Sequence, residues 1–566
     1  MEASDVPEPN ANARISPGDS IGRAVRTLSG LTLGSRVLGL VRDLATVRIF
    51  ADTAVGSAFA AALAIPNMFR RLFGEGALSA AFLPEYARLD ASDPAQASAF
   101  ARTTIALLAL ATGSLTVLAE LALLLALLLS PGDADRTLSL RLIMLTLPFM
   151  PMVCVAAILG GMLQTHGRFA PWAAAPIILN LCIIGACAPY WFIHSASPRT
   201  WGYVISASVL LAGSLQIAWS LRRLRGRVDW NAASEQTRAR VKTMLARMVP
   251  ALIGLGALQL NAFVDTLIAM WPLWVGDTIA GRPYPLDEAS NSVLYYAQRL
   301  YQFPLGVFGI AVATAIFPEL SRASQDHTRF TDLLRRGLRL SLFIALPASA
   351  GLALVRTDLV TTLYAGSDAG FSQAGVRRAE MVVLGYSVGV WAYSLNQLWT
   401  RAFYARNDTT TPMRIALAMV GLNLTLNLAL VWPLGEAGLA WSTSISAMAQ
   451  CVLLARAARG RLGLRGLVDA PTARSLARSL ALTALMGASV WALVTFWGDR
   501  SSWGGSALAL GGATLLGAGL YAGLSRAVRA PELGWILRPG RGEERPGGAR
   551  SPEVQSARSN PQGDSR

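Results

Sequence analysis

Two stretches of the sequence, residues 82–88 (FLPEYAR) and 316–322 (IFPELSR), share the order apolar, apolar, Pro, Glu, apolar, small, Arg. Their prolines, Pro84 and Pro318, lie 234 positions apart. A second pair of segments, 163–171 and 404–412, ends on Pro171 and Pro412 after a polar turn of equal length, at an offset of 241. Two matches at nearly one spacing indicate that the two halves of the chain are copies of one unit.

The composition places this unit in a membrane. Hydrophobic residues make up 53% of the 566 residues, charged residues only 15%, and the mean hydropathy is +0.43. A water-soluble chain carries roughly a quarter charged residues. The deficit excludes a soluble enzyme and most nucleic-acid binders. The net charge of +16 fits cytoplasmic loops rich in arginine better than a nucleic-acid partner.

Fourteen segments are long and apolar enough to cross a bilayer, which takes about 20 residues. Since six is even, two copies of a six-helix unit point the same way through the membrane. We therefore predict an all-α polytopic membrane protein with two parallel six-helix lobes around a central cavity and two extra C-terminal helices. The predicted spans are 24–48, 57–87, 99–130, 137–165, 170–193, 200–221, 248–271, 290–321, 337–363, 378–404, 411–432, 437–457, 475–497 and 504–527.

The connectors set the orientation and the boundaries. Residues 222–247 hold eight cations and 456–474 hold five, so both loops and both termini are predicted to be cytoplasmic. Arg377 and Arg378, after the ninth span, are an exception to this pattern. The predicted parts are a disordered tail (1–21), an N-terminal lobe (22–225), a basic linker (226–247), a C-terminal lobe (248–460), the last two spans (461–529) and a second disordered tail (530–566).

Cations outnumber acids inside predicted spans one, two and eight. A cation at mid-bilayer costs at least about 2.5–3.5 kcal/mol unless it is paired or hydrated. The surplus predicts a hydrated cavity whose guanidinium groups bind phosphate or carboxylate. The alternative is that some arginines, Arg48 above all and also Arg70, extend to lipid headgroups. The charged residues concerned are Arg36, Arg42, Asp43, Arg70, Arg71, Glu75 and Arg299.

The second copy offers different chemistry. Asp265 is an isolated acid in span seven, Asn423 and Asn427 lie one turn apart in span eleven, and Thr443 lies in span twelve. One carboxylate with amide and hydroxyl oxygens suits a hard monovalent cation or a proton. Hydrogen bonds between helices are the alternative use of such residues. The four cysteines lie in apolar runs without paired metal-binding spacing, so no other metal site is predicted.

Four motifs carry a family resemblance. They are GSRVLGLVRD (34–43), IPNMFRRLFGEGA (65–77), YYAQRL (295–300) and FYAR (403–406). The chain resembles, over about 24–527, the MurJ/MviN family of bacterial lipid II flippases. That family belongs to the multidrug/oligosaccharidyl-lipid/polysaccharide exporter superfamily.

The resemblance implies a flippase of the bacterial inner membrane that carries the undecaprenyl-pyrophosphate-linked peptidoglycan precursor to the periplasmic leaflet. It implies a cationic central cavity and a lipid-tail groove formed by the last two spans. Functional arginines of the family match Arg36, Arg42, Arg70 and Arg299, and Asn67, Arg71 and Glu75 fall on motif positions. A sodium site of some members falls on Asp265, Asn423, Asn427 and Thr443, which makes Na+ the one bound or coupling ion that the resemblance suggests.

Three positions depart from the family. Ser57 and Gln298 stand where many members carry Asp, and Asn427 replaces an acid found in some sodium-binding members. Losing the first two acids makes the cavity more positive, which suits a pyrophosphate. It also argues against gating or counter-ion exchange through those carboxylates.

Three functions are therefore compared. The first is a lipid II flippase that works by alternating access as a monomer, with lipid II and membrane lipids as partners and no nucleic acid. The second is a transporter of the same superfamily with another cargo, either a different polyprenyl-linked saccharide or a cation-coupled exporter, although cationic cargo favours acidic cavities. The third is a membrane enzyme acting on prenyl pyrophosphates. It requires clustered acids or a His/Asp pair, which the spans lack.

Overall fold

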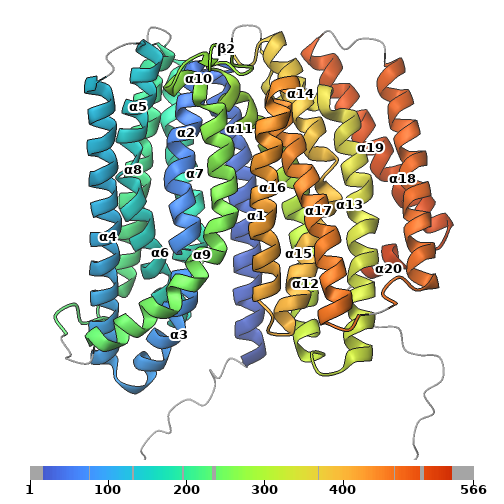
Figure 1. The fold of residues 1–566 in the computed structure, drawn as a ribbon. Coiled ribbons are helices and arrows are strands. Elements are labelled where there is room, and N and C mark those ends of the chain that lie inside the picture. Colours follow the sequence, from blue (N-terminus) through green and yellow to red (C-terminus); the bar gives the residue numbers. More distant parts are fainter. Residues whose placement is uncertain are drawn as a thin grey trace, which may run out of the picture.

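The computed structural model describes most of the chain as helix. The described residues are 17–74, 77–129, 133–193, 197–232, 237–366, 369–464, 466–497 and 502–537. Figure 1 shows the helices between residues 54 and 224 on the left and those between residues 310 and 527 on the right, with the helix of residues 17–50 between them and that of residues 237–269 running from the lower left toward the centre.

The first half contains eight α-helices and two short irregular helices. They are α1 (Pro17–Phe50), α2 (Ala54–Phe69), η1 (Arg70–Gly74), α3 (Ala77–Ser92), α4 (Pro94–Leu129), α5 (Ala134–Thr146), α6 (Phe149–Thr165), α7 (Ala170–Cys187), η2 (Ala188–Trp191) and α8 (Pro198–Leu224). Helix α1 packs along α7 and also contacts α11 and α13 of the other half.

The second half begins with α9, which contacts α3 and α4 on one side and α16 on the other. It contains α9 (Thr237–Ala269), α10 (Trp271–Trp274), β1 (Thr278–Ile279), β2 (Arg282–Pro283), α11 (Ser290–Pro304), η3 (Leu305–Gly309), α12 (Ile310–Arg322), α13 (His327–Tyr364), α14 (Gln373–Ser387), α15 (Val390–Ala405), α16 (Thr410–Leu434) and α17 (Glu436–Arg461). The two strands form an antiparallel hairpin. Last come α18 (Ala470–Phe496), α19 (Trp503–Ala527) and the short α20 (Pro531–Leu537).

Every predicted span coincides with helix, but the helices differ in continuity. Within the described residues, nine helical segments are long and apolar enough to cross a membrane. The other five predicted spans carry charges or are interrupted, for example at Pro66 and η1, at Pro304 and η3, and at residues 388–389. The count of fourteen therefore stays a prediction.

The interruptions repeat as the motifs do. The π-helical turns η1 and η3 begin at Arg70 and Leu305, an offset of 235. Helices α6 and α15 end at Thr165 and Ala405, an offset of 240, and each is followed by a turn with a positive φ, at Gly167 or Asn407. Equivalent turns and breaks at equivalent positions support the internal duplication read from the sequence.

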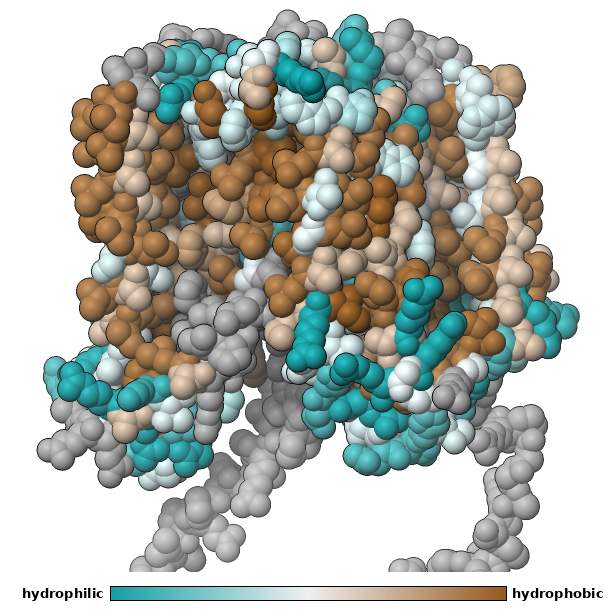
Figure 2. Space-filling model, viewed as in Figure 1, coloured by the Kyte–Doolittle hydropathy of each residue, from teal (hydrophilic) through white to brown (hydrophobic). Residues whose placement is uncertain are grey.

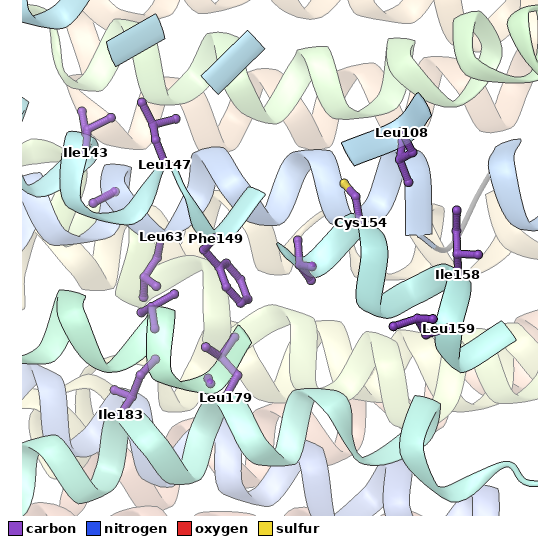
Figure 3. Packing of buried hydrophobic residues seen from close by; sticks show 14 of the residues in the cluster. Leu63, Leu108, Ile143, Leu147, Phe149, Cys154, Ile158, Leu159, Leu179 and Ile183 are labelled. Atoms are coloured by element: carbon purple, nitrogen blue, oxygen red, sulfur yellow. The ribbon is translucent and has the colours of Figure 1, made fainter. Parts of the chain in front are cut away.

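The hydrophobic core is divided in the same way. A first cluster joins α2, α4, α5, α6, α7 and α8, and Figure 3 shows part of it, with Leu63, Phe149 and Leu179 from three helices lying close together. A second cluster includes residues of α11, α13 and α14, and a third includes residues of α12, α13, α15 and α17. A fourth cluster, around Phe343, Met486 and Tyr521, packs α18 and α19 against α13. The division between the halves is not complete, because the first cluster also contains Met270 and Leu273 and the second contains Val47 and Ala60.

The outer surface suits a bilayer. Figure 2 shows a broad hydrophobic band around the helices, with hydrophilic side chains gathered above and below it. The exposed large apolar side chains of α4 include Leu110, Leu118 and Leu128. Exposed leucines over a continuous band are what lipid tails require of a protein surface.

Three predicted boundaries are wrong. Helix α1 begins at Pro17, inside the predicted tail 1–21, and α9 begins at Thr237, inside the predicted linker 226–247. Helix α20 occupies the start of the second predicted tail. These helical segments are polar, so hydropathy alone did not reveal them. The starts of α1 and α9 continue into apolar helices, and α20 is held by ion pairs. Residues 1–16 and 538–566 lie outside the described residues.

Ion pairs hold α20 against the spans. Glu532 has no exposed surface and accepts hydrogen bonds from Arg339 of α13 at 2.8 Å, from Ser475 of α18 at 2.6 Å and from Arg478 of α18. The Trp535 ring stacks against the guanidinium groups of Arg336 and Arg339, at 4.6 and 4.9 Å. A residue of a polar tail is thereby built into the structure.

We predict that Glu532→Gln lowers stability by about 2 kcal/mol. The change leaves two guanidinium groups without their acid, and the cost stays below the 3–5 kcal/mol of a fully buried pair because Arg339 and Arg478 are 18% and 25% exposed. The apparent Tm of the purified protein in detergent measures it. Asp332→Asn, which breaks an exposed pair with Arg335, is the control and should leave the Tm nearly unchanged.

The effect should depend on pH. Burial alone raises the pKa of Glu532, but hydrogen bonds from Ser475 and Arg339 outweigh it and hold that pKa below its ordinary value. The stabilisation is then complete above the ordinary glutamate pKa of about 4.3 and is lost as the pH falls below it. A difference in Tm between wild type and Glu532→Gln that stays constant as the pH falls from about 5 to about 3 would contradict this account.

Candidate functional site

A cavity of about 860 Å³ lies between the two halves of the molecule. Its walls come from α1, α2, α6, α7 and α8 of the first half and from α9, α11 and α15 of the second. Most of its polar lining residues are cations or amides. They are Ser35, Arg42, Asn67, Arg70, Arg71, Asn180, Gln216, Gln259, Asp265, Thr266, Asn291, Tyr295, Gln298, Arg299, Gln302 and Arg401.

Arg42 is fixed at the inner end of this cavity. Its Nη2 lies 2.7 Å from Oδ1 of Asp43, and its Nη1 donates to Oδ1 of Asn180 on α7 at 3.1 Å. Successive side chains on a helix point about 100° apart, but the long arginine stem bends back and brings the guanidinium group to its neighbour's carboxylate. Both residues are buried.

Arg299 reaches the same carboxylate from the other half of the chain. Its Nε lies 3.8 Å from Oδ2 of Asp43, its Nη1 donates to Gln302 at 3.2 Å, and its guanidinium carbon lies 4.6 Å from the ring centre of Tyr295. Two guanidinium groups therefore share one acid, across the boundary between the halves. Arg299 keeps 29% of its side chain exposed, so it remains open to a ligand.

The other predicted residues of the first half fall in three places. Asn67, Arg70 and Arg71 line the cavity, and Nε of Arg70 donates to Asn67 at 3.3 Å. Arg36 is absent from the lining, and its guanidinium lies against η3, where a Cβ added to Gly306 would overlap it. Glu75 lies outside the described residues.

The balance of charge favours an anion. Five arginines and one aspartate are among the described residues that line the cavity. Arg401, which the sequence analysis missed, belongs to this set and lies within the predicted tenth span, so counting every cation inside a span would have found it. Guanidinium groups in a partly desolvated cavity bind phosphate or carboxylate through paired N–H donors.

The four residues of the second copy also come together. Nδ2 of Asn427 donates to Asp265 at 2.6 Å and to Asn423 at 3.0 Å, and Asn423 donates to Thr443 at 3.4 Å. This is the hydrogen-bonded arrangement considered as the alternative. The buried Oδ1 of Asn427 has no partner among the described residues. The oxygens of this cluster fit a monovalent cation in type, and a rotated Asn427 amide would supply one more.

The halves are held together at one end of the cavity. Arg48 donates to the carbonyls of Ala365 and Ala369 at 2.7 and 3.0 Å, so the prediction that it extends to lipid headgroups is wrong. Asp52 accepts from Ser372, by 2.8 Å to its amide and 2.6 Å to its hydroxyl.

Ser57, which replaces a family acid, takes part in the same closure. Its hydroxyl accepts from the amide of Ser292, and its carbonyl accepts from Asn291. Neutral hydrogen bonds between the halves therefore stand at the position where an acidic side chain would place a negative charge.

Arg378 at this end is compensated locally. It donates to Asp287 at 2.7 and 2.9 Å and pairs with Glu436. Burial alone raises the pKa of Asp287, but the Arg378 hydrogen bonds outweigh it and hold the pKa below its usual value. Two acids therefore neutralise Arg378 in the folded structure.

Comparisons with known proteins agree with this architecture. The family model described as "Lipid II flippase MurJ" matches residues 46–508. A "Probable lipid II flippase MurJ" from Vibrio cholerae is 32% identical over 524 residues, covering 87% of this chain and 93% of its own length. The "Lipid II flippase MurJ" of Burkholderia cenocepacia is 30% identical and covers 76% and 82%.

Solved structures show the same fold. A "Lipid II flippase MurJ, inward closed conformation" superposes with a TM-score of 0.71 at 22% identity, covering 90% of this chain and 99% of its own. An inward-facing multidrug transporter of the MATE family superposes with a TM-score of 0.56 at 15% identity, covering 78% and 95%. From the family model and these relatives, the chain belongs to the lipid II flippase MurJ family.

Proposed function

We propose that this protein is a flippase that moves lipid II, the undecaprenyl-pyrophosphate-linked peptidoglycan precursor, from the cytoplasmic to the periplasmic leaflet for cell wall synthesis. The observation that carries the proposal is the pair of guanidinium groups, Arg42 and Arg299, that share Asp43 inside a cavity with few acids. Family membership and the names of the relatives supply the cargo. No bond is made or broken, so the protein is a transporter and not an enzyme.

The helices are proposed to form two parallel six-helix lobes, with α18 and α19 added outside them. Repeated breaks at η1 and η3 and repeated turns after α6 and α15 support this arrangement. Counting the interrupted segments as single spans gives fourteen. Both termini and the basic segments 222–247 and 456–474 are then cytoplasmic, in a bacterial inner membrane. We expect a monomer, with membrane lipids around it and no nucleic acid.

Asp43 is proposed to hold the site in readiness. With no diphosphate present, its carboxylate stabilises the two guanidinium groups at the inner end of the cavity. A diphosphate carries more charge and more acceptor oxygens than one carboxylate, so it competes with Asp43 for their N–H donors. Arg70 and Arg71, which line the cavity from η1, add to the attraction of the diphosphate. Binding thereby changes the contacts between the two halves.

The contacts that close one end of the cavity provide the basis for alternating access. The contacts of Arg48, Asp52 and Ser57 seal the proposed periplasmic side, so the cavity opens toward the cytoplasm. These contacts are mostly hydrogen bonds between the two halves, and such interfaces can exchange without unfolding. We propose that they break when the loaded halves rock, and that the prenyl chain stays in the lipid near α18 and α19.

The cluster around Asp265 is proposed to hold Na+. Asp265, Asn423, Asn427 and Thr443 would supply its oxygens, and the ion would supply the positive charge that the Asn427 amide now directs at Asp265. A different cargo, such as another polyprenyl-linked saccharide, uses the same cationic site. An assay that compares such a lipid with lipid II distinguishes the two cargoes.

We predict that Arg299→Gln lowers lipid II translocation roughly 10- to 150-fold, since a charged hydrogen bond contributes about 1.5–3 kcal/mol. The measurement is the accessibility of lipid II on the outer leaflet of cells depleted of their own flippase. Arg199→Gln, which breaks an exposed pair with Asp135, should transport normally. Full rescue by Arg299→Gln at equal membrane abundance would rule out the cavity assignment.

We predict that Na+ raises the apparent Tm of the purified protein, because a ligand that binds only the folded state adds RT ln(1 + [L]/Kd) of stability. At an ion concentration of about 100 times Kd the gain is about 2.7 kcal/mol. Asp265→Asn should abolish the shift, and choline should not replace Na+. Thr425→Val, on the same helix as Asn423 with an exposed hydroxyl, is the matched control. An equal shift in wild type and Asp265→Asn would disprove the site.

A further inference from the structure

Trp172 stands on the cavity wall, away from the arginines that share Asp43. It lies at the start of α7, lines the cavity and is 37% exposed. A large aromatic face exposed at the wall of a cavity is stabilised when a ligand covers it, because removing apolar surface from water is favourable. The indole is therefore a candidate platform for the part of the cargo that the arginines do not bind.

The neighbouring helix is shaped to hold this indole. Gly160 of α6 is buried, and a Cβ added there would lie 3.1 Å from Cβ and 3.2 Å from Cδ1 of Trp172. Only a glycine allows so close an approach without displacing the ring. Gly160 is thus a positioning residue for Trp172.

An unused acceptor lies beside the same wall. Gln216 of α8 is 4% exposed and lines the cavity, and its Nε2 donates to the carbonyl of Ala175 at 3.0 Å. That bond fixes which end of the amide is which, since a turned amide would set two oxygens against each other. Its Oε1 then finds no hydrogen-bond partner among the described residues.

A second acceptor comes from the backbone of α7. Pro176 lacks the amide that would pair with the carbonyl of Trp172, four residues earlier. Pro176 and Trp172 both line the cavity. A carbonyl that a proline deprives of its helical donor is able to accept a hydrogen bond from a ligand with N–H or O–H groups.

The spacing along α7 separates this wall from the cationic end. Asn180, which binds Arg42, lies eight residues beyond Trp172. At about 1.5 Å per residue the two levels are about 12 Å apart. A diphosphate at Arg42 and Arg299 therefore leaves the group attached to it, on the side toward the open mouth, at the level of Trp172.

We propose that Trp172, Gln216 and the carbonyl of Trp172 form a subsite for the hexosamine sugar next to the diphosphate. An aromatic face covers the C–H face of a pyranose ring, and the two acceptors receive its hydroxyl and acetamido hydrogens. None of these groups is charged, so they distinguish a sugar from a second phosphate. The inference rests on the proposed function and identifies the sugar as the part of the cargo that this wall binds.

The test compares two lipids that share the tail and the diphosphate. Lipid II and undecaprenyl pyrophosphate, which has no sugar, are titrated against the purified full-length protein in nanodiscs, and both Kd values are measured. Trp172→Ala should weaken lipid II by about tenfold and leave undecaprenyl pyrophosphate unchanged. Gln216→Leu should give the same split, about three- to tenfold. Gly160→Ala should do so by displacing the ring, and Trp172→Phe should restore most of the affinity.

Two controls separate the subsite from the function beneath it. Arg299→Gln should weaken both lipids, and Trp191→Ala, at the other end of the α7 segment and 49% exposed, should weaken neither. If Trp172→Ala changes neither Kd, or both equally, the subsite is refuted and Trp172 is an interfacial anchor. If the wild type binds neither lipid, the proposed function fails first.

Discussion

The account depends on one carboxylate held between two guanidinium groups that come from opposite halves of the chain. Asp43 and Arg42 lie on α1, and Arg299 lies on α11, so the shared ion pair joins the two bodies at the depth of the cavity. An arginine placed inside the hydrocarbon region must be paired or hydrated. With two arginines and one acid, both guanidinium groups have a charged partner in the folded protein. One positive charge remains uncompensated and is available to an anionic ligand.

The duplication organises everything around this pair. The motif around Pro84 and Pro318, read from sequence alone, coincides with helices that each follow a π-helical turn, at η1 and η3. A π-helical turn breaks the regular hydrogen-bond ladder and is frequent at functional sites. The two turns differ in what they present: η1 brings Arg70 and Arg71 to the cavity, whereas η3 provides Gly306, against which Arg36 lies. One repeated fold thus gives two chemically distinct walls.

The sequence predicted the helical segments, the repeat and four of the five arginines that line the described cavity, because hydropathy and intramembrane charge are local properties. It could not predict contacts set by the packing of distant helices. The hydrogen bond of Arg42 to Asn180, the capture of Arg48 by the carbonyls of Ala365 and Ala369, and the pairing of Arg378 are of this kind. Helix α20 was missed for another reason: it is fixed by ion pairs of Glu532 rather than by apolar periodicity.

A structure of the full-length protein with lipid II bound tests the central claim most directly. The account predicts both phosphates inside the cavity, with oxygens about 3 Å from the guanidinium nitrogens of Arg42 and Arg299, and Asp43 displaced from at least one of them. A diphosphate seated on the basic outer loops, with Asp43 still holding both arginines, would contradict it.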